Sequence, residues 1–458
     1  MRIIILGAGT VGEALARNLV KEDNDVVLID NSQACLDDIK QRLDVQTVHG
    51  NASNPSILIE AGIEQADLII AVTTTDEANM IGCLIANKLF QVPRAIARIR
   101  SEDYYQYPQL FKKNVIPIQS LICPTELVIH HIIRMIEYPD FSQILTFFND
   151  SVSIVSIETQ ENDWMQGKTI AEIKKKLKSI QVAIIAIFNH KQFVAVEDTY
   201  IMSTKDTLLF MSSVRHLRSL LNTLQRKRNQ NRRIMIAGGG RLGCGLAKQL
   251  ETNYQVKLIE KSTKKIETNA SQLNKTIVLQ GEIADRELLL SENIQDMDIF
   301  CALTNDDEAN IMGGLQAKYL GVKYAMSLVN RESYIDLIED SLIDYAISPQ
   351  FITISSILSK IRRGNMIKVH RLQNAEAEAI ELIVEGNEQT SAVIGRLISD
   401  IELPPHCIMA GVIRGKRLYF MSSKIILAPK DHVILLLLDK KYLHQLESLF
   451  QVNLTFMS

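Results

Sequence analysis

The sequence predicts an α/β fold in which two doubly wound parallel sheets are each followed by a small α+β domain. Three observations predict it. Two glycine-rich turns, Gly7–Gly12 and Gly238–Gly243, begin 231 residues apart in a chain of 458. Each turn follows a short apolar run and opens a helical pattern. Around each turn, apolar runs of strand length alternate with longer helical stretches, as in sheets built from strand–helix–strand units.

The strand-like runs occur in two sets of six. In the first set they are 3–6, 26–29, 45–48, 68–72, 95–99 and 115–118. In the second set they are 234–237, 256–259, 277–279, 299–303, 325–329 and 345–347. Helical patterns such as 11–20 and 78–89 lie between them. Each set therefore predicts one doubly wound sheet.

The two halves also match outside the glycine turns. The run Val72–Met80 aligns in register with Leu303–Ile311. Further along, Gly167–Ile173 pairs with Gly395–Ile401. The order is therefore A–B–A′–B′, with domains predicted at 1–140, 141–225, 232–365 and 366–455. The basic stretch 225–231 is expected to be a solvated linker between the halves.

Composition limits the class of protein. A net charge of −3 argues against a dedicated nucleic-acid binder. The six cysteines are scattered without a Cys-x-x-Cys pair, which is typical of a reducing cytosol. No run approaches the ~18 apolar residues of a membrane span, and the apolar start is too short for a signal peptide. We therefore expect a soluble protein whose membrane role, if it has one, comes through a partner.

The glycine turns have the spacing and context of a dinucleotide-binding loop, twice. The first glycine permits a tight turn, the second lets backbone approach a pyrophosphate, and the third lets the helix pack on the strand. The predicted ligand residues of these Rossmann-like loops are Gly7, Ala8, Gly9, Thr10, Val11 and Gly12, and Gly238, Gly239, Gly240, Arg241, Leu242 and Gly243.

An acidic residue ends the second strand of each half, Asp30 in the first and Glu260 in the second. A carboxylate there accepts hydrogen bonds from ribose hydroxyls and repels a 2′-phosphate. NAD(H) or an adenine nucleotide is therefore favoured over NADP(H).

Polar residues at the ends of later strands extend the predicted sites. Thr73 and Thr74 end the fourth strand and Thr304 is their counterpart; capping of the next helix is an equally good role for them. Arg98 ends the fifth strand and could bring a cation near phosphate, whereas its counterpart is Leu328. Because Arg241 could supply that charge in the second loop, the two sites are not expected to be equivalent.

Residues that would indicate catalysis are absent from the sequence pattern. No proton donor or acceptor stands in a recognisable constellation, and no cluster has metal-ligand spacing. A phosphate-binding Walker loop is also missing. We therefore expect a protein that is not an enzyme.

Taken together, the domain order, Ile5-Leu-Gly-Ala-Gly9, Thr75-Asp-Glu-Ala-Asn79 and Ile347-Ser-Pro-Gln350 resemble the TrkA family. Members are Trk-system potassium uptake regulatory proteins built from two RCK (regulator of potassium conductance) halves. The resemblance covers essentially the whole chain. It implies that the A units are RCK N-terminal domains binding NAD(H), with ATP or ADP as further candidates, and that the B units are RCK C-terminal domains.

The resemblance also implies partners and a location. The chain would form a homo-oligomeric ring, a tetramer of tandem chains, on the cytoplasmic face of the inner membrane. It would be held there by a Trk-type potassium-translocating membrane subunit and would gate potassium transport. After the third strand, however, the family commonly has Gly-Asp-Ala-Ser/Thr, with the acid near the adenine. This chain has Asn51 and Glu282 at those positions.

Two alternatives remain open: an NAD-dependent oxidoreductase with a duplicated Rossmann fold, and a nucleotide-sensing subunit of another cation transporter. The activating nucleotide, the occupancy of each half, the ring stoichiometry and the membrane partner also remain open. Finally, the helices at 124–136 and 350–361 are candidates for exchange with a neighbouring chain, although their apolar spacing suits an internal core equally well.

Overall fold

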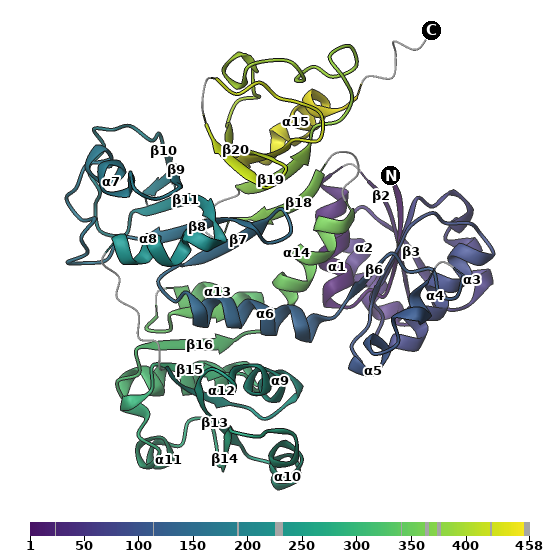
Figure 1. The fold of residues 1–458 in the computed structure, drawn as a ribbon. Coiled ribbons are helices and arrows are strands. Elements are labelled where there is room, and N and C mark those ends of the chain that lie inside the picture. The colour runs from purple at the N-terminus through teal and green to yellow at the C-terminus, as the bar shows by residue number, and fades with distance from the viewer. Residues whose placement is uncertain are drawn as a thin grey trace. The chain divides into compact units, whose positions relative to one another are not determined.

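The computed structural model describes residues 1–22, 24–112, 114–189, 192–224, 232–339, 341–361, 366–372, 377–421 and 424–452. The predicted linker at 225–231 lies outside these residues. The chain forms two compact units, each combining one segment from either half (Figure 1). Unit 1 comprises Met1–Ile133 and Asn231–Ile361, and unit 2 comprises Arg134–Gln230 and Arg362–Ser458. The domain boundaries given above remain predictions.

The first half of unit 1 is a doubly wound α/β domain. Its elements are β1 (Arg2–Leu6), α1 (Thr10–Val20), β2 (Asp25–Asp30), α2 (Gln33–Arg42), β3 (Gln46–His49), α3 (Pro55–Glu60), β4 (Leu68–Ala71), α4 (Asp76–Lys88), β5 (Ala95–Arg98), α5 (Glu102–Tyr105), β6 (Ser120–Ile122) and α6 (Pro124–Glu137). The described strands are parallel in the order β3-β2-β1-β4-β5-β6. This is the order of dinucleotide-binding sheets.

The second half of unit 1 repeats that architecture. Its elements are β12 (Arg233–Ala237), α9 (Arg241–Leu250), β13 (Gln255–Glu260), α10 (Thr263–Gln272), β14 (Ile277–Gln280), α11 (Arg286–Ser291), β15 (Ile299–Ala302), α12 (Asp307–Tyr319), β16 (Tyr324–Leu328), α13 (Glu332–Glu339), β17 (Tyr345–Ile347) and α14 (Pro349–Ile361). The described strands follow the order β14-β13-β12-β15-β16-β17. The predicted fold class is confirmed for both sheets.

One predicted strand is wrong. The sixth strand of the first half is β6, a few residues later than the predicted 115–118. Val115 is 47% exposed, and Pro117 has no backbone N–H to give to a sheet. Ser120, in contrast, is in register with Ile96 of β5.

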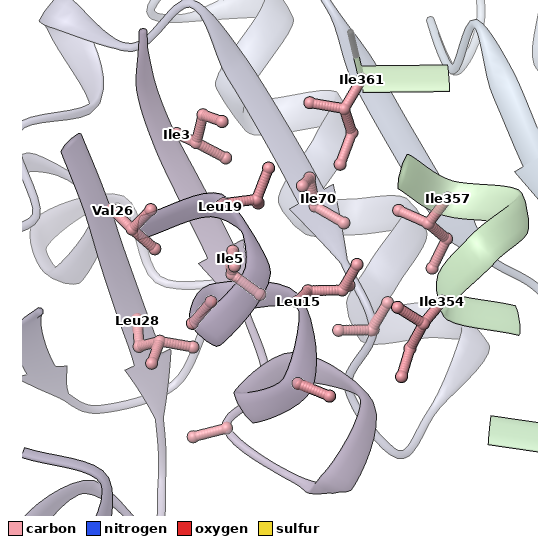
Figure 2. Close-up of a cluster of buried hydrophobic side chains, with 14 of the residues drawn as sticks. Ile3, Ile5, Leu15, Leu19, Val26, Leu28, Ile70, Ile354, Ile357 and Ile361 are labelled. Carbon is pink, nitrogen blue, oxygen red and sulfur yellow. The ribbon is translucent and has the colours of Figure 1, made fainter. Parts of the chain in front are cut away.

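The last helix of the second half packs on the sheet of the first half. Ile354, Ile357 and Ile361 of α14 are buried in one apolar cluster with Leu15 and Leu19 of α1 (Figure 2). In the first half, the guanidinium of Arg94 donates to the carbonyl oxygens of Lys360 and Ile361, at 2.6 and 3.1 Å. A cation at this end of α14 satisfies carbonyls that have no partner within the helix.

The equivalent helix of the first half makes the reciprocal contact. A β-carbon on Gly245 of α9 would lie 2.8 Å from Cδ1 of Ile129 in α6. Gln249 of α9 donates to the carboxylate of Glu126 at 3.4 Å. Within the described residues, each helix therefore packs on the other half of the same chain, and exchange with a neighbouring chain stays a prediction.

Unit 2 contains two antiparallel sheets with the same strand order. The first domain consists of β7 (Gln143–Phe147), β8 (Val152–Glu158), α7 (Ile170–Leu177), β9 (Val182–Asn189), β10 (Gln192–Val194), β11 (Thr207–Ser213) and α8 (Leu217–Thr223). The second consists of β18 (Met366–Arg371), β19 (Glu378–Ile383), β20 (Cys407–Arg414), β21 (Arg417–Phe420), β22 (His432–Leu437) and α15 (Leu443–Phe450). Their described strands run β10-β9-β11-β8-β7 and β18-β19-β22-β20-β21.

The repeat in unit 2 is imperfect. Helix α7 starts with a capping box between Thr169 and Glu172. The equivalent stretch of the second domain forms only a 3-10 turn, Ile398–Asp400. Pro404 and Pro405 follow closely, and the residue before a proline is disfavoured in helix.

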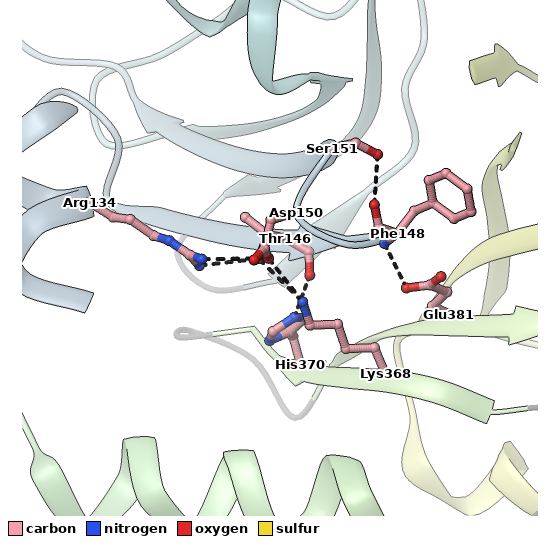
Figure 3. Close-up of polar contacts among 8 residues, drawn as sticks. All are labelled: Arg134, Thr146, Phe148, Asp150, Ser151, Lys368, His370 and Glu381. Carbon is pink, nitrogen blue, oxygen red and sulfur yellow. Dashed lines mark hydrogen bonds and ion pairs between the residues drawn. The ribbon is translucent and has the colours of Figure 1, made fainter. Parts of the chain in front are cut away.

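The two domains of unit 2 share one apolar core and a set of polar contacts. Residues of both, including Phe147 and Leu436, lie in the same buried cluster. Figure 3 shows Arg134, Asp150 and Lys368 converging on Thr146. Asp150 lies 3.5 Å from Arg134 and 3.2 Å from Lys368. These contacts join a turn of the first domain to β18 of the second.

Two histidines complete the contact between the domains. Nε2 of His370 donates to the carbonyl oxygen of Thr146 at 2.9 Å, and burial lowers the pKa of His370 to about 4. Glu381, which is 1% exposed, accepts from the backbone N–H of Phe148 at 3.0 Å and contacts Nδ1 of His432 at 2.7 Å. The turn containing Phe148 is thereby tied to the second sheet.

Within the described residues, no helix combines the length and apolar character needed to cross a bilayer.

Candidate nucleotide-binding sites

The glycine loop of the first half connects β1 to α1 with a geometry that only glycine allows at two positions. Gly7 has φ +104°, which L-residues rarely adopt. A β-carbon on Gly12 would lie 1.8 Å from the carbonyl oxygen of Gly7. On Gly9 it would meet nothing within 4 Å. Gly7 and Gly12 thus serve the turn and the packing, while Gly9 leaves space open above the loop.

The second loop has the same geometry. Gly238 has φ +110°, and a β-carbon on Gly243 would lie 1.9 Å from the carbonyl oxygen of Gly238. Gly240 again has nothing within 4 Å. The spacing predicted the same three roles in both halves, and both loops have this geometry.

Each loop ends at a helix N-terminus without a side-chain cap. Gly9 is the N-cap of α1 and Gly240 the N-cap of α9, and neither N-cap makes a side-chain hydrogen bond to its helix. The first turns contain Thr10 and Val11, and Arg241 and Leu242. Uncapped amides with the positive end of the helix dipole form a binding site for anions.

The acidic residues at the ends of β2 and β13 lie beneath these loops. Asp30 accepts hydrogen bonds from the backbone N–H groups of Ala8 and Ser32, at 2.7 and 2.8 Å. Glu260 accepts from Gly239 and Ser262, both at 2.8 Å. The carboxylates therefore hold the loops in place.

The second loop has one further support. Asn269 of α10 is buried and donates to the carbonyl oxygen of Gly239 at 3.0 Å. A β-carbon on Gly239 would lie 2.3 Å from that amide nitrogen. This contact explains a glycine where the first half has Ala8, and the sequence pattern alone gave no signal for it.

Thr73 with Asn79, and Thr304 with Asn310, form the same hydrogen-bonded arrangement between neighbouring strand ends, which we call the threonine–asparagine lock. The backbone N–H and hydroxyl of Thr73 both donate to the amide oxygen of Asn79, at 2.8 and 2.7 Å. The amide nitrogen of Asn79 donates to the carbonyl oxygen of Arg98 at 2.8 Å. Thr304 and Asn310 form the same arrangement in the second half.

Residues near these threonines cap the helices α4 and α12. Thr75 is the N-cap of α4, and Asp306 is the N-cap of α12. The capping role considered for Thr73 and Thr304 is therefore taken by residues two positions later. Thr74 is exposed beside them, and its carbonyl oxygen accepts from Arg100 at 3.3 Å.

Arg98 is a buried cation behind the first loop. Its guanidinium donates to the carbonyl oxygens of Val72 and Thr73, at 2.6 and 2.8 Å, while its Nε has no hydrogen-bond partner among the described residues. Burial lowers the pKa of Arg98 to about 10, helped by the nearby charge of Arg100. Gly7 packs against the same Thr73 backbone, so this charge lies close to the loop.

The second half has no cation at that place. Its counterpart, Leu328, is a buried apolar residue whose carbonyl oxygen accepts from Asn310. At the opposite side of the site, Lys261 and Glu282 form an ion pair of 2.6 Å. In the described residues, no group of three or more His, Cys, Asp or Glu side chains is placed to hold a metal ion.

Comparison with known proteins identifies the family. The family model of the TrkA-N domain matches residues 3–123 and 234–349, the two doubly wound halves. The Trk system potassium uptake protein TrkA of Vibrio alginolyticus is 42% identical over 458 residues, which cover the full length of both chains. This chain belongs to the TrkA family. The TrkA of Halomonas elongata is 40% identical, again over the full length of both chains.

Solved structures resemble this TrkA-family chain in fold. The GsuK RCK domain has a TM-score of 0.60 at 17% identity, covering 98% of this chain and 95% of its own. A GsuK channel bound to NAD has a TM-score of 0.60 at 18% identity, covering 98% and 79%. The predicted resemblance to the TrkA family and the RCK fold are both confirmed.

Proposed function

We propose that this chain is a non-catalytic regulatory subunit of a Trk-type potassium uptake system that senses a nucleotide. One observation carries the proposal: both loops have an open space at the middle glycine, an uncapped helix and an acid beneath. That combination fits a pyrophosphate above the loop and a ribose beside the acid.

NAD(H) is the first candidate ligand, with ATP or ADP next. The RCK-type channel of similar fold that is bound to NAD supports this choice. Arg98 adds positive charge behind the first loop, which favours a phosphate-bearing ligand. The ligand residues are those predicted from the two loops, with Asp30, Thr73, Thr74, Arg98, Glu260 and Thr304.

The exchanged helices suggest how binding becomes a signal. Helix α1 begins in the first loop and packs against α14 of the second half. A ligand that binds one arrangement of this pair more tightly shifts the equilibrium toward it, by its differential affinity alone. The change would be passed to a homo-oligomeric ring on the cytoplasmic face of the inner membrane, and from there to a potassium-translocating membrane subunit.

Calorimetric titration tests the sensor. NADH, NAD, ATP and ADP are titrated into the full chain and into Gly9→Asp and Gly240→Asp variants. A carboxylate at either position occupies space that is open in the free protein and repels phosphate. We expect each variant to lose one class of site while keeping its melting temperature. Absence of binding to the unmodified chain would refute the sensor.

Gating needs a second experiment. The chain is reconstituted into liposomes with a Trk-type membrane subunit, and rubidium uptake is followed with and without each nucleotide that binds. We expect uptake to change with nucleotide and to lose that response in the variant lacking the relevant site. Uptake that ignores a bound nucleotide would refute the regulatory role while leaving binding intact.

A further inference from the structure

The two sites differ in charge at the end where the ribose would bind. The eight residues after Asp30 contain Asp37 and Asp38 and no basic residue, a net charge of −2. The eight residues after Glu260 contain three lysines and Glu267, a net charge of +2. These lysines are Lys261, Lys264 and Lys265.

The acid of the second site is compensated by one of these lysines. Oε2 of Glu260 lies 3.9 Å from Nζ of Lys265, and the Glu260 side chain is only 8% exposed. Both carboxylate oxygens already accept backbone N–H groups. Asp30 accepts equivalent backbone groups, but no ion pair to it occurs among the described residues, and it is less buried. The positive charge of Lys265 beside Glu260 therefore weakens the repulsion of a ribose phosphate at the second site.

The second lysine is placed to receive a phosphate. Lys261 follows Glu260 directly at the carboxyl end of β13, and its side chain is 77% exposed. Its only anionic partner in the described structure is Glu282, two residues after the end of the adjacent β14. The first half has the uncharged residues Asn31 and Asn51 at the matching positions. A basic side chain at this place accommodates the 2′-phosphate of NADP.

We propose that the second site selects an adenine nucleotide carrying a phosphate on its ribose 2′ position, whereas the first takes the unphosphorylated ribose. This inference rests on the proposed nucleotide-binding function and revises its ligand for one half only. The phosphate would replace Glu282 as the partner of Lys261. Glu282 thus competes with the ligand for the same ammonium group.

The test compares NADPH with NADH by calorimetry on the full chain. Gly9→Asp isolates the second site and Gly240→Asp the first. We expect NADPH to bind at least about tenfold more tightly than NADH at the second site, and the reverse order at the first. Equal affinities, or preference for NADH at both sites, would overturn the inference.

Two further variants separate the charge effect from damage to the fold, and are made in the Gly9→Asp background. Lys261→Gln should weaken NADPH about tenfold and leave NADH almost unchanged, because NADH has a hydroxyl and no phosphate at that place. Glu282→Gln should tighten NADPH, since it removes the competing carboxylate. A loss of both ligands in Lys261→Gln, or no gain in Glu282→Gln, would count against the proposal. If neither dinucleotide nor ATP binds either site, the failure lies with the proposed function itself.

Discussion

The different roles of Gly9 and Gly12 in the first loop predict different effects of alanine at the two positions. At Gly12 an added β-carbon would lie 1.8 Å from a backbone oxygen, whereas ordinary contact begins at 3.4 Å. Helix α1 and the turn must therefore separate by roughly 1.5 Å. Overpacking of this kind costs about 1–3 kcal/mol or more. Gly12→Ala should consequently lower the stability of unit 1 and, by displacing the loop, weaken nucleotide binding as well.

At Gly9 the same substitution should leave the fold nearly unchanged. The residue has φ −69° and ψ −176°, an extended conformation open to alanine, and the β-carbon meets nothing within 4 Å. Loss of glycine at an N-cap costs roughly 0.5–1 kcal/mol, and the reduced freedom of the unfolded chain returns about 0.4–1 kcal/mol. Nucleotide binding should still weaken, because the methyl group occupies the space above the loop.

Thermal unfolding, followed by circular dichroism, measures the stability of each variant, and calorimetric titration measures its nucleotide binding. For a domain of this size, about 1 kcal/mol corresponds to a shift of ~2–4 °C in melting temperature. We expect Gly9→Ala to melt within ~2 °C of the unmodified chain and Gly12→Ala to melt clearly lower. Gly240→Ala and Gly243→Ala repeat the comparison in the second half. Unchanged affinity in Gly9→Ala, or an unchanged melt in Gly12→Ala, would refute this division of roles.

Three other predictions follow from the packing and the buried polar groups. Ile357→Ala on α14 should cost about 2–5 kcal/mol in urea unfolding, because the side chain is fully buried, while Ile59→Ala, 54% exposed, should cost little. Asn79→Ala should lower the free energy of unfolding by about 2–4 kcal/mol and weaken nucleotide binding, since it leaves the strand-end groups of Thr73 and Arg98 unpaired. An unchanged melting temperature in this variant would contradict the role of the threonine–asparagine lock. Burial lowers the pKa of His370 from 6.5 to about 4 because it penalises the charged imidazolium. The free energy of unfolding should therefore be unaffected by this group above pH 6.5 and fall by up to about 3 kcal/mol as the pH drops from 6.5 to 4. His370→Gln should reduce this loss in pH-dependent unfolding, and an identical pH profile would count against it.

Much of unit 1 could be predicted from the sequence because its signals are local. A glycine that needs positive φ, a glycine against a carbonyl oxygen and an acid at a strand end all lie within about 25 residues of one another. These constraints follow from the turn itself, so the spacing of the residues determines them. The sixth strand was misplaced because 115–118 is equally apolar; Pro117 counts against a strand there, and pairing with β5 identifies Ser120–Ile122 as the strand.

The remaining features depend on contacts between segments far apart in the chain. The apolar spacing of α14 indicates a buried face, but periodicity does not say which sheet covers it. Ile357 packs on a helix more than 330 residues earlier in the chain. In the same way, Asn79 reads in the sequence as part of a matched motif, and its role becomes visible only where its amide meets Thr73 and Arg98.

The duplication separates residues shared by the two scaffolds from residues that differ around the open loops. Several scaffold residues are identical in the two halves, as in the threonine–asparagine lock and in Asp76 and Asp307, which accept the backbone N–H groups after the fifth strand. The differences gather around the open loop, in the pairs Arg98 and Leu328, Asn31 and Lys261, and Asn51 and Glu282. Because the loop geometry is the same in both halves, any difference in ligand must arise largely from these side chains. Exchanging them between halves should exchange the ligand preferences, and a preference that stays with its original half would place its origin in the scaffold.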